Sequence, residues 1–239
     1  MNARPDAAAP AARILRAALR AGIVLFVCVA TWWLLVALLR VPAYLLPGPD
    51  VVAGKIVFLA RAAQLERHVA ATVAEIVLGS GIGAASGIAC GWLFDRSPRL
   101  GRLLSPLILL LQTAPKIAIV VFFPVLAGTV AGLGSVEPAC RDLARLLRLG
   151  AFARFRRIEL PFALPAIFAG LRIASTQAVT AAVVGELIGA TAGLGYLLSL
   201  GQENNDAGVA MAAIAMLSIL GWALHELVRA VETRILRAR

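Results

Sequence analysis

Long apolar runs separated by short charged segments dominate the pattern of this chain. Three of them, 21–39, 76–94 and 207–224, contain no charged residue. Each is close to the length that one helical bilayer crossing needs. Two further apolar stretches, 103–136 and 161–188, are interrupted by prolines and isolated charges. The pattern predicts an all-α, polytopic membrane protein with about five to six transmembrane helices.

The composition agrees with a membrane protein, and the distribution of charge adds the orientation of the chain in the membrane. Of 239 residues, 61% are hydrophobic and 15% are charged, and the mean hydropathy is +0.88. The formal net charge is +10, but the basic residues flank apolar runs without aromatic interleaving, so we expect no nucleic acid partner. The positive-inside rule places segments 1–20, 141–172 and 229–239 and the short, turn-rich loop 95–102 in the cytoplasm, and segment 40–68 outside.

The first connection and the second long helix carry local signals. The prolines and glycine of 42–49 end the first helix. Residues 51–67 are predicted to form a short amphipathic helix on the outer membrane surface. The next helix, over 69–94, carries glycines spaced four residues apart, from Gly79 to Gly91. Small residues at this spacing predict close helix packing in a membrane.

The chain divides into a transmembrane domain, 21–228, a tail of residues 1–20 and a basic tail of residues 229–239, with both tails expected in the cytoplasm. Its longest polar stretch, 137–160, is rich in arginine and runs directly into a proline-containing apolar segment. A basic amphipathic segment of this kind either lies on anionic lipid or docks into a groove of a partner. The apolar side chains that would form such a grip are Leu146, Leu147, Leu149, Phe152 and Phe155.

The stretch 142–172 resembles the cytoplasmic coupling loop of ABC importer permeases, whose pattern is Glu-Ala-Ala, three residues, Gly, nine residues, Ile, one residue, Leu-Pro. An arginine stands here where the pattern has its glycine, which departs from the tight turn that glycine allows. Most of residues 44–225 resembles permeases of the nitrate, sulfonate and taurine type. The residues implied in coupling to an ATPase are Asp142, Leu143, Ala144, Arg148, Gly150, Ile158, Leu160 and Pro161.

This resemblance implies a type I ABC importer permease fold and a subunit that carries a small solute across the bacterial inner membrane. Oxyanions, sulfonates and vitamin precursors all stay open as solutes. The implied partners are cytoplasmic ATPase subunits, an extracytoplasmic substrate-binding protein, a second copy of the chain and the lipid bilayer. The chain has no G-x-x-x-x-G-K-[ST] loop, so we expect another subunit to hydrolyse ATP.

The alternative function is a membrane-embedded enzyme or assembly factor that uses its basic loop to bind lipid. It has little support, because no pair of catalytic residues stands at helical spacing. The three cysteines stand at no metal-ligand spacing. We therefore expect no enzymatic activity, no cofactor and no metal in this chain.

Polar residues beside or within the apolar segments are candidates for a translocation pathway, because such groups are costly in lipid and often line a path. A carboxylate at the headgroup level or paired with an arginine is the alternative for the acidic candidates, and a lysine reaching the interface is the alternative for the basic one. The candidates are Glu75, Gln112, Thr113, Lys116, Gln177 and Glu186.

The apolar stretch 103–136 conflicts with the charge pattern. Basic segments on both sides of it are expected inside, so an even number of crossings must separate them. Fully helical, the stretch is about 51 Å long, which fits one crossing but not two. Permeases resembling this chain carry about one more helix's worth of residues here, so we expect a deletion near 119–121. It leaves either a re-entrant hairpin hinged at 115–116, with its turn buried in protein, or one long helix.

Overall fold

The computed structural model describes residues 8–62, 64–111 and 116–237 of the chain. These residues form helices joined by short connections and contain no strand, so the predicted all-α class is confirmed. In chain order the elements are α1 (Ala8–Leu39), α2 (Pro49–Arg61), α3 (Gln64–Arg96), α4 (Pro98–Leu111), α5 (Ile117–Gly134), α6 (Pro138–Leu146), α7 (Ala151–Arg154), the π-helical turn η1 (Phe155–Glu159), α8 (Leu160–Gly189), α9 (Leu194–Glu203) and α10 (Ala207–Arg237).

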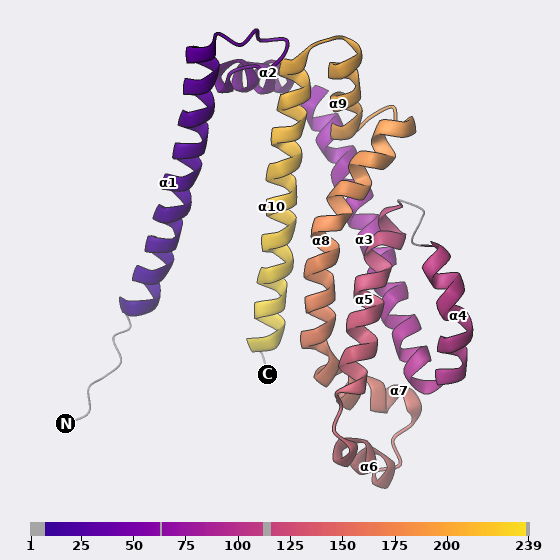
Figure 1. Cartoon of the computed structure of the whole chain (residues 1–239). Helices are drawn as coiled ribbons and strands as arrows, with labels where there is room; N and C mark the ends of the chain where they lie inside the picture. Colours follow the sequence, from indigo (N-terminus) through magenta and orange to yellow (C-terminus); the bar gives the residue numbers. More distant parts are fainter. Residues whose placement is uncertain (1–7, 63, 112–115, 238–239) are drawn as a thin grey trace, which may run out of the picture.

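Within the described residues, five helical segments are long and apolar enough to cross a membrane, in agreement with the predicted number. Helices α1 and α8 run toward the end of the molecule where α2 and α9 lie, which we call the outer end (Figure 1). Helices α3, α5 and α10 run back toward the end where α6 and α7 lie, the inner end (Figure 1). The five segments are Gly22–Leu39, Leu65–Arg96, Ile117–Gly134, Ala151–Gly189 and Ala207–Arg237.

Two predicted boundaries are wrong. The amphipathic helix expected over 51–67 ends at Arg61, and α3 starts three residues later. Segment 95–102 is not a loop, because α3 continues to Arg96 and α4 starts at Pro98. A proline at the first position of a helix is already in helical geometry, and the N–H groups of residues 100 and 101 donate to the carbonyl oxygen of Ser97. The turn between the two helices is therefore very short.

Helix α5 lies at the centre of the bundle, packed on one side against α3 and on the other against α8. A Cβ atom added at Gly83 of α3 would lie 2.5 Å from the carbonyl oxygen of Ala118 in α5. A Cβ atom at Gly132 of α5 would lie 2.8 Å from the carbonyl oxygen of Ala163 in α8. Only glycine fits at such distances, so the predicted close packing through the glycines of α3 is confirmed and extends to the α5–α8 contact.

Helices α4 and α5 run antiparallel to each other (Figure 1). Of the two arrangements predicted for 103–136, the structure therefore has the hairpin and not the single long helix. Residues 112–115, between the two helices, lie outside the described residues. With 14 and 18 residues, the two helices are about 21 and 27 Å long, so α4 is shorter than a hydrocarbon core of about 30 Å and α5 is close to that length. The hairpin returns the chain to the inner end.

Helix α2 lies across the outer end of the bundle (Figure 1). Its Lys55 donates a hydrogen bond of 2.5 Å from Nζ to Oδ2 of Asp206, in the connection before α10. This hydrogen bond holds the pKa of Asp206 below its usual value, against the opposing effect of burial. Leu59 of α2 is buried in a cluster that contains Leu194 of α9 and Leu217 of α10. Helix α2 is thus fixed to the bundle by packing as well as by charge.

We expect Gly83→Ala to lower the stability of the protein, because the added methyl group meets the backbone of α5. Overpacking of a rigid core costs about 1–3 kcal/mol. Gly81→Ala is the matched control, since a Cβ atom there has nothing within 4 Å. Thermal unfolding of the two purified variants in detergent measures the difference. Equal unfolding midpoints would contradict the close α3–α5 contact.

Candidate functional site

The polar stretch after α5 forms the short helices α6 and α7 at the inner end, and we refer to residues 137–160 as the coupling loop. Helix α6 ends in a Schellman motif. The N–H of Arg148 donates to the carbonyl of Arg145 at 2.9 Å, and the N–H of Leu149 donates to that of Ala144 at 3.1 Å. Arg148 has a φ of 48°, at the position where the resembled pattern has glycine. The tight turn therefore forms in spite of the arginine side chain.

The coupling loop exposes a ridge of apolar side chains. Among the five expected to form a grip, Leu149 is only partly exposed and Phe155 turns inward, with its ring centroid 5.2 Å from that of Trp92 in α3. The other three of these side chains are exposed, and so is Leu143, which belongs to the coupling motif. Apolar side chains gathered on an exposed surface mark an interaction site. The ridge consists of Leu143, Leu146, Leu147 and Phe152, which are 52%, 81%, 60% and 66% exposed.

The motif residues divide between the two ends of the coupling loop. Ala144 of α6 is fully buried, whereas Asp142 on the same helix is exposed and forms an ion pair of 2.9 Å with Arg145. Gly150 is exposed at the start of α7. Leu160 packs on the core of the bundle. The other partly buried members, at the junction with α8, are Ile158 and Pro161.

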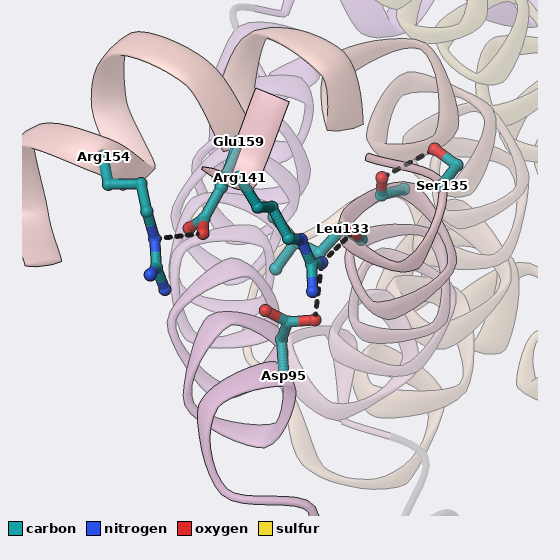
Figure 2. A network of polar contacts seen from close by, with 7 residues as sticks. Asp95, Leu133, Ser135, Arg141, Arg154 and Glu159 are labelled. Carbon is teal, nitrogen blue, oxygen red and sulfur yellow. Dashed lines mark hydrogen bonds and ion pairs between the residues drawn. The ribbon is translucent and has the colours of Figure 1, made fainter. Parts of the chain in front are cut away.

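Polar contacts attach the coupling loop to the inner ends of two membrane helices. Arg141 of α6 donates to Oδ1 of Asp95 in α3 at 3.2 Å and to the carbonyl oxygen of Leu133 in α5 at 2.6 Å (Figure 2). Arg96 of α3 donates to the carbonyl oxygen of Ala151 at 3.2 Å. The coupling loop therefore lies at the same end as segment 95–102, as the charge pattern predicted. Sequence reasoning did not identify this contact, because its members are far apart in the chain.

Glu186, near the outer end of α8, is enclosed within the chain and only 1% exposed. Its Oε1 accepts a hydrogen bond of 2.6 Å from the hydroxyl of Thr72 in α3, and its Oε2 accepts one of 2.6 Å from the N–H of Gly195. The N–H of Gly193 donates to Nδ1 of His68 at 3.1 Å. These contacts fix the α8–α9 connection to α3. The carboxylate of Glu186 thus faces the interior of this chain, and its place on a solute path stays a prediction.

The remaining pathway candidates come from different elements. Glu75 on α3, Lys116 just before α5, and Gln177 on α8 are exposed. Gln112 and Thr113 lie outside the described residues. None of the three described side chains is enclosed by the chain itself, so each is free to face lipid, water or another protein.

Sequence reasoning missed the neighbours of Gln177 on α8. Arg172, Thr176 and Thr180 are exposed too, and their regular spacing of four places them on one face of the helix. An open groove between α8, α9 and α10 adjoins this face and includes Thr176, Thr180 and Ser218 in its lining. Polar groups within membrane helices usually face a cavity or another protein. The spacing alone was a usable signal.

A bundle of membrane-spanning helices with a partly apolar loop attached at its inner end is the arrangement that the resemblance to transport permeases implies. The family model described as "Binding-protein-dependent transport system inner membrane component" matches residues 117–237. The chain therefore belongs to this family. It is a multi-pass inner-membrane permease subunit of an ABC importer that translocates a small solute. The members of its family are transport permeases and not enzymes. Membership implies an ATPase and a substrate-binding protein as partners.

Relatives with assigned names align with most of the chain. A probable ABC transporter permease protein of Haemophilus influenzae is 29% identical over 234 residues, covering 89% of this chain and 93% of the relative. The taurine transport system permease protein TauC of Escherichia coli is 28% identical, covering 88% and 86%. The formylaminopyrimidine transport permease protein ThiX of Halalkalibacterium halodurans is 32% identical, covering 74% and 79%. The predicted resemblance to permeases of this type is confirmed.

We expect Arg148→Gly to stabilise the turn after α6, because a left-handed backbone costs a side-chain-bearing residue about 1–2 kcal/mol and glycine nothing. The greater freedom of glycine in the unfolded chain reduces the net gain to roughly 1 kcal/mol or less. Arg148→Ala is the control, since it removes the same charge but keeps the Cβ atom. Thermal unfolding should rank the glycine variant above both the alanine variant and the original chain. Identical behaviour of the two variants would contradict the left-handed turn.

Proposed function

We propose that two copies of this chain form the solute path of the importer and that the coupling loop of each copy docks into an ATPase subunit. The observation that carries this proposal is the exposed apolar ridge, Leu143, Leu146, Leu147 and Phe152, on a loop that is itself bound to α3 and α5. A docked loop must resist being pulled away from the membrane helices if it is to move them. The Arg141 contacts supply that attachment.

The polar face of α8 supports the second copy. Arg172, Thr176, Gln177 and Thr180 are exposed on one membrane-spanning helix, where facing lipid is costly. A second copy opposite this face would enclose it and leave a path lined by hydroxyl, amide and guanidinium groups. Glu75 and Lys116 are the further described residues that we assign to the path, and Gln112 and Thr113 are assigned to it on sequence grounds alone.

The solute class is inferred from the relatives. Their names specify taurine in one case and formylaminopyrimidine in another, which are both small and polar. A path lined by hydroxyl and amide groups, with charges of both signs from Arg172, Lys116 and Glu75, suits such solutes, because it offers hydrogen-bond donors and acceptors without a strong excess of one charge. We infer a small polar solute, sulfonate or pyrimidine precursor, delivered by the binding protein.

We further propose that the chain lacks a segment near 119–121 that its relatives retain. The alignment with the Haemophilus relative has 234 positions. It covers 89% of this 239-residue chain, and this share contains fewer than 234 residues. Part of the alignment is therefore occupied by the relative alone. The family match begins at residue 117, at the start of α5. The short hairpin keeps the coupling loop on the inner side, which supports a working transporter in spite of the deletion.

The test is ATP-dependent uptake by the chain reconstituted in liposomes with the ATPase and binding protein from the same genome. Taurine, an alkanesulfonate and formylaminopyrimidine are the solutes to supply. We expect uptake of at least one of them that stops without ATP. Uptake of none above the ATP-free level, with all subunits assembled, would contradict the proposed function.

In the same assay we expect Ala144→Leu and Asp142→Lys to uncouple ATP hydrolysis from uptake. Ala144 is fully buried, so a leucine there must displace α6, and the lysine reverses the charge of the exposed motif residue. Ala139→Leu is the control, because Ala139 is exposed on the same helix. Unchanged uptake together with unchanged co-purification of the ATPase in both variants would contradict the role of this motif.

A further inference from the structure

The coupling loop joins α8 through a π-helical turn. The turn, η1, spans Phe155–Glu159, and the N–H of Leu160 donates to the carbonyl oxygen of Phe155, five residues earlier. A π-turn holds one residue more than an α-helical turn, is rare, and is found mostly at functional sites. It is the joint between the coupling loop and α8, and it lies within a segment that is long and apolar enough to cross a membrane.

Pro161 gives a local reason for the wide turn. Proline cannot donate a backbone hydrogen bond, and inside an α-helix its ring collides with the carbonyl group four residues earlier, here that of Arg157. A wider turn before Pro161 moves this carbonyl away from the ring. Proline alone does not fix the geometry, because kinked α-helices relieve the same collision. A second interaction is needed to select the π-turn.

The ion pair between Arg154 and Glu159 supplies that selection. Nε of Arg154 lies 2.6 Å from Oε1 of Glu159 (Figure 2). The glutamate side chain is 1% exposed and the arginine side chain 26%. Among the described residues neither carboxylate oxygen of Glu159 accepts a hydrogen bond of full geometry. The charge of Arg154 is therefore the main compensation for a buried carboxylate, and loss of one partner leaves the other uncompensated.

The spacing of this pair suits a π-turn and not an α-helix. In an α-helix the side chains that meet are three or four residues apart, while side chains five apart are turned away from each other by about 140°. The additional residue of the π-turn brings positions 154 and 159 onto one side. The pair thus stabilises the π-turn relative to the α-helical alternative. If the π-turn relaxed to an α-helical turn, the loss of its one additional residue would rotate the preceding loop by about 100° relative to α8.

We propose that the Arg154–Glu159 pair is a latch that holds η1 as a π-turn and thereby sets the rotational position of the coupling loop relative to α8. This inference rests on the proposed docking of the loop to an ATPase. Arg154 and Glu159 are positioning residues: they act through the direction in which the loop presents its ridge. Arg141, bound to α3 and α5, anchors the other end of the loop, so a change in the joint twists the loop between two fixed ends.

The first measurement is a distance that needs no transport. Spin labels at position 146 on α6 and position 173 on α8, both exposed in the native chain, are introduced after replacement of the three native cysteines. We expect Glu159→Gln to shift or broaden the distance distribution measured by electron paramagnetic resonance in nanodiscs. Arg157→Gln is the matched control, because it removes a charge from an exposed residue of the same turn. An unshifted distribution in Glu159→Gln would overturn the latch.

The second measurement is solute uptake per ATP hydrolysed in the reconstituted complex. We expect Glu159→Gln to keep the ATPase bound and active while uptake per ATP falls about tenfold, the size of a typical coupling between two sites. Arg157→Gln should keep the original ratio. A shifted distance with an unchanged ratio would overturn the role of the latch in coupling. Absence of uptake by the original complex would refute the proposed function, while the distance measurement still decides on the latch.

A neutral double variant covers the case in which Glu159→Gln alone fails to fold, since the partly buried Arg154 would then lack its partner. Arg154→Gln with Glu159→Gln leaves no unpaired charge and also lacks the latch. We expect it to give the same distance shift and the same loss of uptake per ATP. A double variant that folds and keeps the original distances and ratio would overturn the proposal.

Discussion

The contact of α5 with α3 and α8 is the interaction on which the rest of the molecule depends. In lipid there is no hydrophobic gain in bringing apolar helices together, so association relies on close packing and small residues. Gly83 on one side of α5 and Gly132 within it let the backbones approach to distances that a methyl group would prevent. The resulting three-helix unit carries the coupling loop at its inner end and the enclosed Glu186 contacts at its outer end. Any loosening of α5 would therefore release both ends.

The coupling loop is held at several places by different kinds of interaction. Arg141 bonds it to α3 and α5, the Phe155 ring packs on Trp92, and the π-turn continues it into α8. A force applied to the exposed ridge is consequently shared among all three core helices instead of bending one of them. This arrangement explains why an exposed, basic segment with little core of its own keeps a defined shape.

Much of the fold was predictable from sequence, because apolar length and arginine asymmetry are strong signals in membrane proteins. The start of α4 was predictable too, since Ser97 followed by Pro98 is a helix-start signal, but the turn-forming residues of 95–102 were given more weight. The coupling motif could be located, but the left-handed turn at Arg148 could not, because two backbone hydrogen bonds compensate for the missing glycine. The contacts of Glu159 and Glu186 could not be predicted from sequence. Glu159 pairs with Arg154 at a spacing of five, which is not a contact distance in an α-helix, and Glu186 bonds to Thr72, which is far away in the chain.

The short hairpin of α4 and α5 has a consequence for the surrounding membrane. Its two helices do not reach the level at which α3 and α8 end on the outer side (Figure 1), so in that sector the subunit presents a smaller hydrophobic thickness to the bilayer. Lipids adapt to such mismatch by local thinning, at a fraction of a kcal/mol per Å. The protein is thus asymmetric as an object embedded in lipid, thin beside α4 and thick beside α10. A subunit of this shape favours short acyl chains on one flank only, and lipid sorting around it acts as a further determinant of how neighbouring proteins approach.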